Sequence, residues 1–352
     1  MMVLSPLLAV ALTVVVGFVI FLAIGIDPVR GIYVYFIEPL TVAWSVQETL
    51  VKAIPIVLIA VGLALCYLAN NWNIGAEGQF TAGAIAGSAL PILWPEFQNG
   101  ATLPFMLVAG IAGGMLYAAI PALLKTRFGT NEILTSLMLV YVSLLSLDWL
   151  VRGPWRDPQG YGFPGSRAFS EAATMPLLVE GSRLHLGLIF AMVAVVAGWF
   201  LIRHTLVGFA IRVMGQAPRA GAFGGFSRNR TTLITFLISG GLAGLAGICE
   251  VAGPIGKLDV TISPGYGFTA IIVAFLGRLN PIGILIAGFV LAVTYIGGET
   301  AQITLGLSSD TARVFQGMLL FFVLACDTFI LYRIRLVPVR SLDTAGARDG
   351  NA

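Results

Sequence analysis

The chain has 352 residues, of which 58% are hydrophobic and only 11% are charged. Soluble domains carry about 25% charged residues, so this composition excludes an ordinary water-soluble protein and indicates a polytopic membrane protein. The formal net charge of +3 is too small to indicate a nucleic-acid partner, and the basic residues lie in loops that flank apolar segments. The cysteines are far apart and form no CxxC pair, so they indicate neither a metal site nor a disulfide framework.

Apolar segments recur along the chain, and about 20 such residues cross a bilayer. The first segment lacks a basic n-region, so we expect a retained span rather than a signal peptide. The segment 266–278 is short and follows the glycine-rich stretch Pro264–Gly267, so a broken or re-entrant helix is expected there. We expect about ten spans, near 4–26, 51–70, 75–94, 101–124, 132–151, 184–202, 231–250, 266–278, 281–299 and 312–332.

These spans predict an all-α polytopic membrane protein with one domain over residues 1–335 and a tail over 336–352. Basic residues concentrate in the loops on one side, and Lys and Arg next to spans stay in the cytoplasm. Both termini and the segment 203–230 are therefore expected in the cytoplasm. Two long segments, 27–50 and 152–183, are expected outside. The second is rich in proline, glycine and aromatic residues, which predicts an ordered but irregular cap, either a structural lid or a landing site for a periplasmic partner.

Polar residues inside a membrane usually face a path or a partner. The cluster Asn70–Gln79 lies between two almost charge-free runs, and Asn73, Glu77 and Gln79 offer donors and acceptors there. Capping of helix ends is favoured over direct contact with a solute. Asn131 is expected to cap the fifth span.

Other polar residues are expected to have simpler roles. Glu250 and Asp148 lie near the outer ends of their spans, where interfacial solvation accounts for them, and His185 is likewise expected at an interface. Gly240 and Gly244 lie four residues apart in the seventh span, a spacing typical of close helix packing.

A short sequence pattern occurs in both halves of the chain. Both Gly75–Ala82 and Gly265–Ala270 have a glycine-rich start followed by Phe-Thr-Ala. Corresponding glycine-interrupted segments in two halves indicate a substrate path in transporters, although chance remains the alternative for one shared tripeptide.

No motif for hydrolysis is present. The sequence has no Gly-x-x-x-x-Gly-Lys-Ser/Thr, no His/Glu zinc motif and no Gly-x-Ser-x-Gly elbow. We therefore expect no enzyme activity, no catalytic residue, no metal and no cofactor in this chain. If the protein uses ATP, another chain binds it.

The basic, glycine-rich segment Gly208–Phe226 separates two spans. Its residues predict a short helix over 206–214, a break before Pro218 and a second short helical piece. A loop of this size on the basic side of the membrane is expected to be a docking surface for a soluble partner.

Three stretches, Asn73–Gln79, Gly208–Phe226 and Gly265–Pro281, together resemble the permease subunits of bacterial ABC importers in the ribose/branched-chain amino acid permease superfamily. The Glu-Gly-Gln of the first stretch, the run Thr130–Leu139 and the outer loop Trp155–Gly165 are most similar to the nucleoside (guanosine/purine nucleoside) branch. The resemblance covers nearly all of residues 50–330.

This resemblance implies a non-enzymatic permease in the bacterial inner membrane. A tandem ATPase subunit, a second permease that is related but distinct, and a periplasmic or lipid-anchored solute-binding protein would be its partners, and nucleosides its solute. The residues expected to couple to the ATPase are Gly208, Arg212, Gly215, Gln216, Pro218, Ala220 and Gly225. The candidates for the substrate path are Asn73, Glu77, Gln79, Tyr266 and Phe268.

Two alternatives stay open from the sequence. A sugar or branched-chain amino acid permease would share the same architecture. An ion-coupled secondary transporter would need ionisable residues in the middle of a span, and Glu77 is the candidate for that role.

Overall fold

The fold was analysed in a computed structural model, which describes residues 4–160, 162–308, 310, 313–314, 317–318, 321–322 and 325. Over these residues the chain is helical, and its strand-like pairings are two isolated bridges. The helices are α1 (Leu4–Ile24), α2 (Pro28–Ile32), η1 (Tyr33–Ile37), α3 (Glu38–Thr41), α4 (Ala43–Leu68), α5 (Ala76–Leu93), α6 (Thr102–Phe128), α7 (Glu132–Arg152), η2 (Glu171–Ala173), α8 (Gly187–His204), α9 (Leu206–Gln216), α10 (Pro218–Phe223), α11 (Arg228–Glu250), η3 (Val251–Ile255), α12 (Tyr266–Leu276) and α13 (Pro281–Leu305).

Among the residues that the structure describes, six helices are long and apolar enough to cross a membrane: α4, α6, α7, α8, α11 with η3, and α13. The expected all-α class is confirmed, and each of these helices overlaps an expected span. The expected span 312–332 lies mostly outside the described residues. The outer segment expected at 27–50 is largely helical, since it contains α2, η1, α3 and the first turns of α4.

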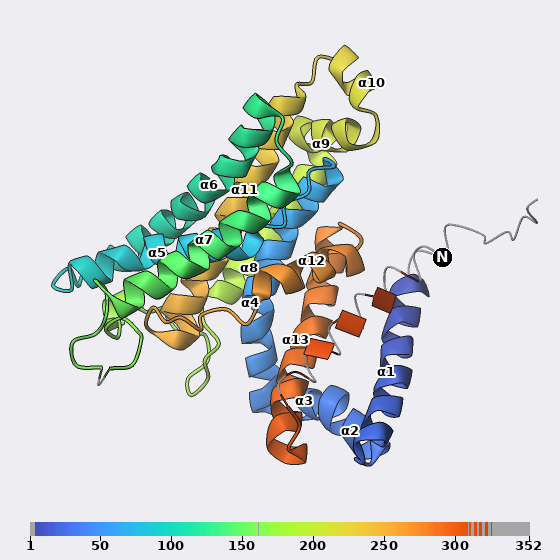
Figure 1. Cartoon of the computed structure of the whole chain (residues 1–352), viewed down its shortest axis with the longest axis vertical. Helices are drawn as coiled ribbons and strands as arrows, with labels where there is room; N and C mark the ends of the chain where they lie inside the picture. The colour runs from blue at the N-terminus through green and yellow to red at the C-terminus, as the bar shows by residue number, and fades with distance from the viewer. Residues whose placement is uncertain are drawn as a thin grey trace, which may run out of the picture.

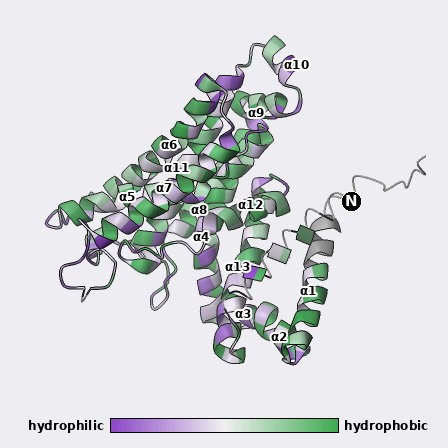
Figure 2. Cartoon of the chain, in the orientation of Figure 1, coloured by the Kyte–Doolittle hydropathy of each residue, from purple (hydrophilic) through white to green (hydrophobic). Residues whose placement is uncertain are grey.

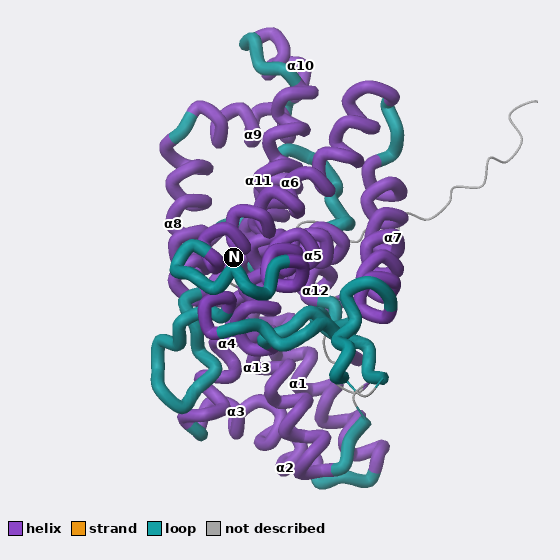
Figure 3. The backbone as a smooth tube through the Cα atoms, turned by 90° about the vertical axis from the view of Figure 1, so that its left-hand side faces the viewer, coloured by secondary structure: helices purple, strands orange, loops and turns teal. Residues whose placement is uncertain are grey.

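The helices form one bundle with two distinct ends. In Figure 1, α9 and α10 lie at the top beside the C-terminal end of α6 and the N-terminal end of α11, which we call the α10 end. The loop 153–186 lies at the opposite end, the loop end. Hydrophobic residues run along the helices, and hydrophilic residues gather toward the two ends (Figure 2). The view in Figure 3 places α7 and α8 on opposite flanks.

The core of the bundle forms around α4, which is mostly buried and contacts α8, α11, α12 and α13. On one side of it, α5, α6 and α11 approach each other closely at glycine residues. A Cβ added at Gly244 would lie 2.2 Å from the carbonyl oxygen of Gly110, and one added at Gly83 would lie 2.2 Å from the Cα of Gly244. A Cβ at Gly240 would lie 2.4 Å from the carbonyl oxygen of Gly114. The close packing expected at Gly240 and Gly244 is confirmed.

The loop 153–186 forms the irregular cap that the sequence predicts. Its backbone bonds to the segment after η3: the Ser166 N–H donates to the Leu258 carbonyl at 2.8 Å, and the Phe169 N–H donates to the Gly256 carbonyl at 2.8 Å. His185 lies two residues before α8 begins, at the end of a span as expected, but it is 1% exposed and therefore buried in protein. The loop folds this ring against Gly253, and burial lowers the pKa of His185 to about 4.

The glycine contacts generate a prediction about stability. Gly244→Ala places a methyl group against backbone that has no flexible side chain to move, so we expect an overpacking cost of about 1–3 kcal/mol. The readout is the thermal midpoint of the purified protein in detergent. Gly100→Ala is the matched control, because a Cβ there meets nothing within 4 Å. Equal midpoints for the two variants would show that the helix contact tolerates a side chain.

Candidate functional site

A non-helical segment, residues 69–75, enters the bundle between α4 and α5. Near the α10 end, the Asn71 amide oxygen accepts hydrogen bonds from Lys125 Nζ at 2.9 Å and from the Thr232 hydroxyl at 3.1 Å. The Asn71 amide nitrogen donates to Thr235 Oγ1 at 3.2 Å. Lys125 also pairs with Glu132 of α7. Side chains from α6, α7 and α11 therefore hold the start of this segment.

Deeper in the bundle, Asn73 and Gln79 form a reciprocal amide pair. Each donates its amide N–H to the oxygen of the other at 3.0 Å, and the Asn73 amide also donates to Ser239 Oγ at 3.1 Å. The Asn73 oxygen accepts the Gly75 N–H at 3.1 Å, just before α5 begins. Ser239 lies eleven residues after the start of α11, a rise of about 16 Å, so this pair sits inside the bundle. Each side-chain nitrogen and oxygen atom of the pair has at least one protein partner.

Glu77 connects the two segments that share a sequence pattern, Gly75–Ala82 and Gly265–Ala270. It lies in the first turn of α5, is 3% exposed, and its Oε2 accepts the Gly267 N–H at 2.6 Å. A Cβ added at Gly267 would lie 2.3 Å from the Glu77 nitrogen. The N-terminal turns of α5 and α12 therefore meet inside the bundle, and the carboxylate of one helix caps the other, where the helix dipole favours negative charge.

The remaining path candidates divide into a buried and an exposed residue. Tyr266 is buried beside Phe80, with ring centroids 6.0 Å apart, and its hydroxyl donates to Glu250 Oε1 at 3.2 Å. Phe268 is 42% exposed. We define Asn71, Asn73, Glu77 and Gln79 as the interior polar cluster. Asn73 and Gln79 contact each other. Glu77 and Tyr266 lie at the same helix start, the beginning of α12.

The environment of Glu250 differs from the one that the sequence predicts. It was expected to be solvated at the end of its span, yet it is 5% exposed. The cause is η3, which continues α11 to Ile255 and carries the chain past Glu250. Asp148 does lie at a solvated end, where its side chain is 45% exposed and pairs with Arg152.

The segment 203–230 has the two helical pieces that the sequence predicts, α9 and α10, with Pro218 as the first residue of the second. Two of its glycines serve internal packing. A Cβ on Gly208 would lie 2.1 Å from the Leu201 carbonyl oxygen in α8, and one on Gly215 would lie 1.9 Å from the Leu68 carbonyl oxygen at the end of α4. The α9 helix is thus pressed directly against the ends of two long helices.

The other expected coupling residues are accessible. Gln216, Pro218, Ala220 and Gly225 are exposed, and Arg212 is half-buried. The sequence reasoning missed Phe223, which ends α10 and is 97% exposed. A large apolar residue directly before Gly224 and Gly225, in the helical piece that follows Pro218, was the available signal. The tip of α10 projects away from the bundle (Figure 1).

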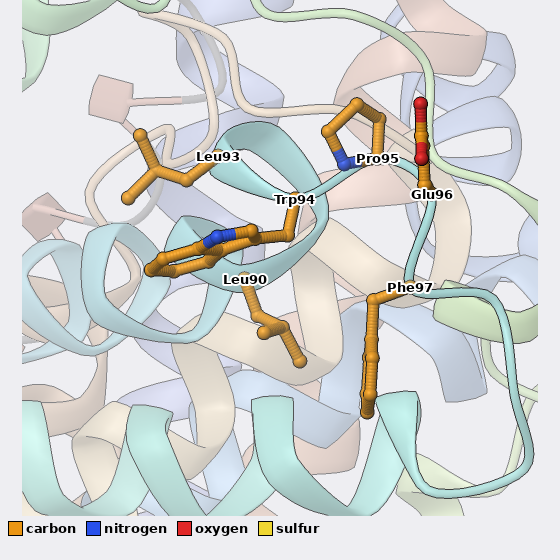
Figure 4. Close-up of a pocket in the computed structure, with 6 residues that line it drawn as sticks. All are labelled: Leu90, Leu93, Trp94, Pro95, Glu96 and Phe97. Carbon is orange, nitrogen blue, oxygen red and sulfur yellow. The ribbon is translucent and has the colours of Figure 1, made fainter.

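A hollow of about 690 Å³ lies at the end of α5 near the loop end, lined by Leu90, Leu93, Trp94, Pro95, Glu96 and Phe97 (Figure 4). Trp94 is 60% exposed. Aromatic side chains at the end of a membrane helix are typical of the boundary between membrane and water, so Trp94 and Phe97 account for this hollow without a ligand.

Comparison with known proteins places the chain among transporters. The sequence model of the family described as "Branched-chain amino acid transport system / permease component" matches residues 45–324. A glucose ABC transporter permease of Haloferax volcanii is 36% identical over 342 residues, covering 94% of this chain and 89% of that protein. A guanosine ABC transporter permease of Bacillus subtilis is 30% identical and covers 95% of each chain. A nucleoside ABC transporter permease of Lactococcus lactis is 29% identical over 91% of this chain and 90% of its own. No solved structure matches.

The contact between Glu77 and Gly267 predicts a graded loss of stability. Glu77→Gln keeps an oxygen that accepts the Gly267 N–H, whereas Glu77→Ala leaves that buried donor unpaired, which costs about 1–3 kcal/mol. We expect the thermal midpoint in detergent to fall slightly for the first variant and clearly for the second. Glu96→Ala, an exposed acid just beyond the same helix, is the control. A normal midpoint for Glu77→Ala would contradict the capping role.

Proposed function

This chain belongs to the permease components of branched-chain amino acid transport systems, and we propose that it is the membrane subunit of an ABC importer that carries nucleosides. The proposal rests on the family match, which spans most of the chain, and on the nucleoside and guanosine permeases among its relatives. The observation that carries the mechanism is the α9–α10 segment, which projects from one end of the bundle and packs directly on α4 and α8.

A sugar is the second candidate solute, because the relative with 36% identity is named as a glucose permease. Nucleosides and sugars are both neutral and carry hydroxyl groups. The interior polar cluster suits such solutes, since its amides form hydrogen bonds without fixed charge. We propose Asn73, Glu77, Gln79, Tyr266 and Phe268 as residues of the solute path in a state in which α5 and α12 have separated.

We propose that ATP hydrolysis takes place in a tandem ATPase subunit and that this chain performs no catalysis itself. The exposed residues Arg212, Gln216, Pro218, Ala220 and Gly225 would line the contact with the ATPase, and Phe223 would be its apolar anchor. Aromatic residues that become fully buried are typical anchors of protein interfaces.

Movement of α10 would be transmitted through packed backbone. Gly215 lies against the carbonyl of Leu68, and Leu68 ends the helix that leads into residues 69–75. Because packed surfaces shift as units rather than deform continuously, a displacement of α9 would move this segment and the start of α5. Gly208 would pass the same displacement to α8.

The remaining proposals concern assembly and topology. We propose about ten spans in two related halves, a single membrane domain over residues 1–335 with the tail 336–352, and both termini on the cytoplasmic side with α10. A second permease, related but distinct, would complete the pore in the bacterial inner membrane. A periplasmic or lipid-anchored binding protein would deliver solute at the loop end, where the cap 153–186 is a suitable landing site.

The proposed function is tested by measuring whether solute uptake depends on ATP or on the proton gradient. Right-side-out vesicles that hold the complete transporter are loaded with ATP or left without it, and uptake of radiolabelled guanosine and D-glucose is measured. We expect ATP-dependent uptake that persists when an uncoupler collapses the proton gradient. Uptake that stops on uncoupling while ATP remains would identify an ion-coupled transporter instead.

The proposed anchor predicts a specific loss of ATPase binding. Phe223→Asp should weaken association with the ATPase subunit by about thirtyfold or more, corresponding to the 2 kcal/mol or more that a buried aromatic anchor contributes. Association is measured by titrating the purified ATPase against the permease in nanodiscs. Phe163→Asp is the matched control, because Phe163 is 76% exposed in the cap at the loop end.

A second variant separates docking from transmission of movement. Gly215→Glu places a side chain where the Leu68 carbonyl lies, so it should abolish transport while the protein still inserts into the membrane. Normal transport by Gly215→Glu, or normal ATPase affinity for Phe223→Asp, would refute the assignment of α9 and α10 as the coupling element.

A further inference from the structure

A polar cavity of about 260 Å³ opens at the loop end, between the first half of α4, the end of α11 and the start of α12. Its walls include Glu48 and Lys52 of α4, Glu250 of α11, Tyr266 of α12 and Arg183 of the cap loop. These residues come from four separate parts of the sequence. Tyr266 lines this cavity, and Glu77 of the interior polar cluster bonds to its neighbour in the sequence, Gly267.

Each cation of this cavity already faces a carboxylate. Arg183 donates through Nε to Glu48 Oε1 at 2.9 Å and through a second nitrogen to Glu48 Oε2, and this bond raises the pKa of Arg183. Lys52 Nζ lies 3.7 Å from Glu299 Oε1. The cavity therefore has no unpaired cation among its described lining residues with which to neutralise a carboxylate on a solute.

Glu250 differs from the other acids. It is 5% exposed, its Oε1 accepts the Tyr266 hydroxyl, and its Oε2 is buried without a hydrogen-bond partner. Buried polar atoms without partners are uncommon in folded proteins, because each costs the desolvation of that group. Glu250 is one of the residues that line the cavity, and its buried Oε2 is the carboxylate oxygen that still lacks a donor.

We propose that this cavity binds the hydroxyl groups of a sugar ring, with Glu250 Oε2 as the acceptor. The proposal rests on the function proposed above, since nucleosides and sugars share a hydroxylated ring. A hydroxyl donates to Glu250, and its own oxygen accepts from the N–H groups that Lys52 and Arg183 do not use in their ion pairs. The volume is below the roughly 300–1,000 Å³ of sites for drug-sized ligands, so the cavity holds one ring and leaves a nucleobase outside it.

The test is direct binding of solutes to the assembled permease and ATPase subunits in nanodiscs, without the solute-binding protein. The probes are guanosine, guanine, D-glucose and L-leucine. Glu250→Gln keeps the size of the side chain and removes the charged acceptor. A charge-assisted hydrogen bond contributes about 1.5–3 kcal/mol, so we expect guanosine and D-glucose to bind about tenfold to a hundredfold more weakly, while guanine is unaffected.

The control is Asp148→Asn, an exposed acid at the same end of the bundle whose carboxylate lies outside the cavity. Unchanged binding of guanosine to Glu250→Gln, an equal loss for guanine, or competition by L-leucine that depends on Glu250 would each overturn the proposal. The thermal midpoint of each variant shows that it is folded. ATP-driven uptake by the unaltered transporter tests the proposed function separately. If that uptake is observed while the Glu250 variant binds guanosine normally, the importer function stands and only the cavity proposal fails.

Discussion

The structure depends on one constraint: in lipid every backbone N–H and C=O needs a partner, and a helix that starts inside a bundle leaves its first N–H groups without one. Here α5 and α12 both start inside. The chain supplies the missing partners from its own side chains, since Asn73 accepts the N–H of Gly75 and Glu77 accepts that of Gly267. The polar residues of the interior are therefore required by where these helices begin.

The same arrangement makes the contact between the starts of α5 and α12 the place where a conformational change costs the least free energy. The α5, α6 and α11 helices touch through backbone at their glycines, and such contacts cannot slide without collision. The contact between the two helix starts depends instead on a few hydrogen bonds, each with a small net contribution to stability. In the proposed transport cycle, separation of α12 from α5 would expose the Asn73–Gln79 pair and Glu77 together, so that structural caps would also serve as groups for a solute.

The sequence predicted those features whose signals are local. Long apolar runs predicted α4, α6 and α13, and Pro218 predicted the break between α9 and α10. The bond between Glu77 and Gly267 joins residues 190 positions apart, and no local pattern predicts such a pairing, although the shared Phe-Thr-Ala pointed to both segments. Burial of Glu250 was missed because a π-helical turn with Pro254 continues the helix, where proline normally signals an end.

If the solute follows the path proposed above, the polar groups of the interior also limit which solutes the chain suits. Asn73, Gln79 and Ser239 are neutral, and the carboxylate of Glu77 is already bonded to the start of α12. A zwitterionic amino acid would need a fixed cation for its carboxylate, and Lys125 near this region is held by Glu132 and Asn71. Moving an unpaired charge past such groups carries a large desolvation cost. Neutral solutes with many hydroxyls avoid that cost, because amides and hydroxyls exchange one hydrogen bond for another as the solute passes.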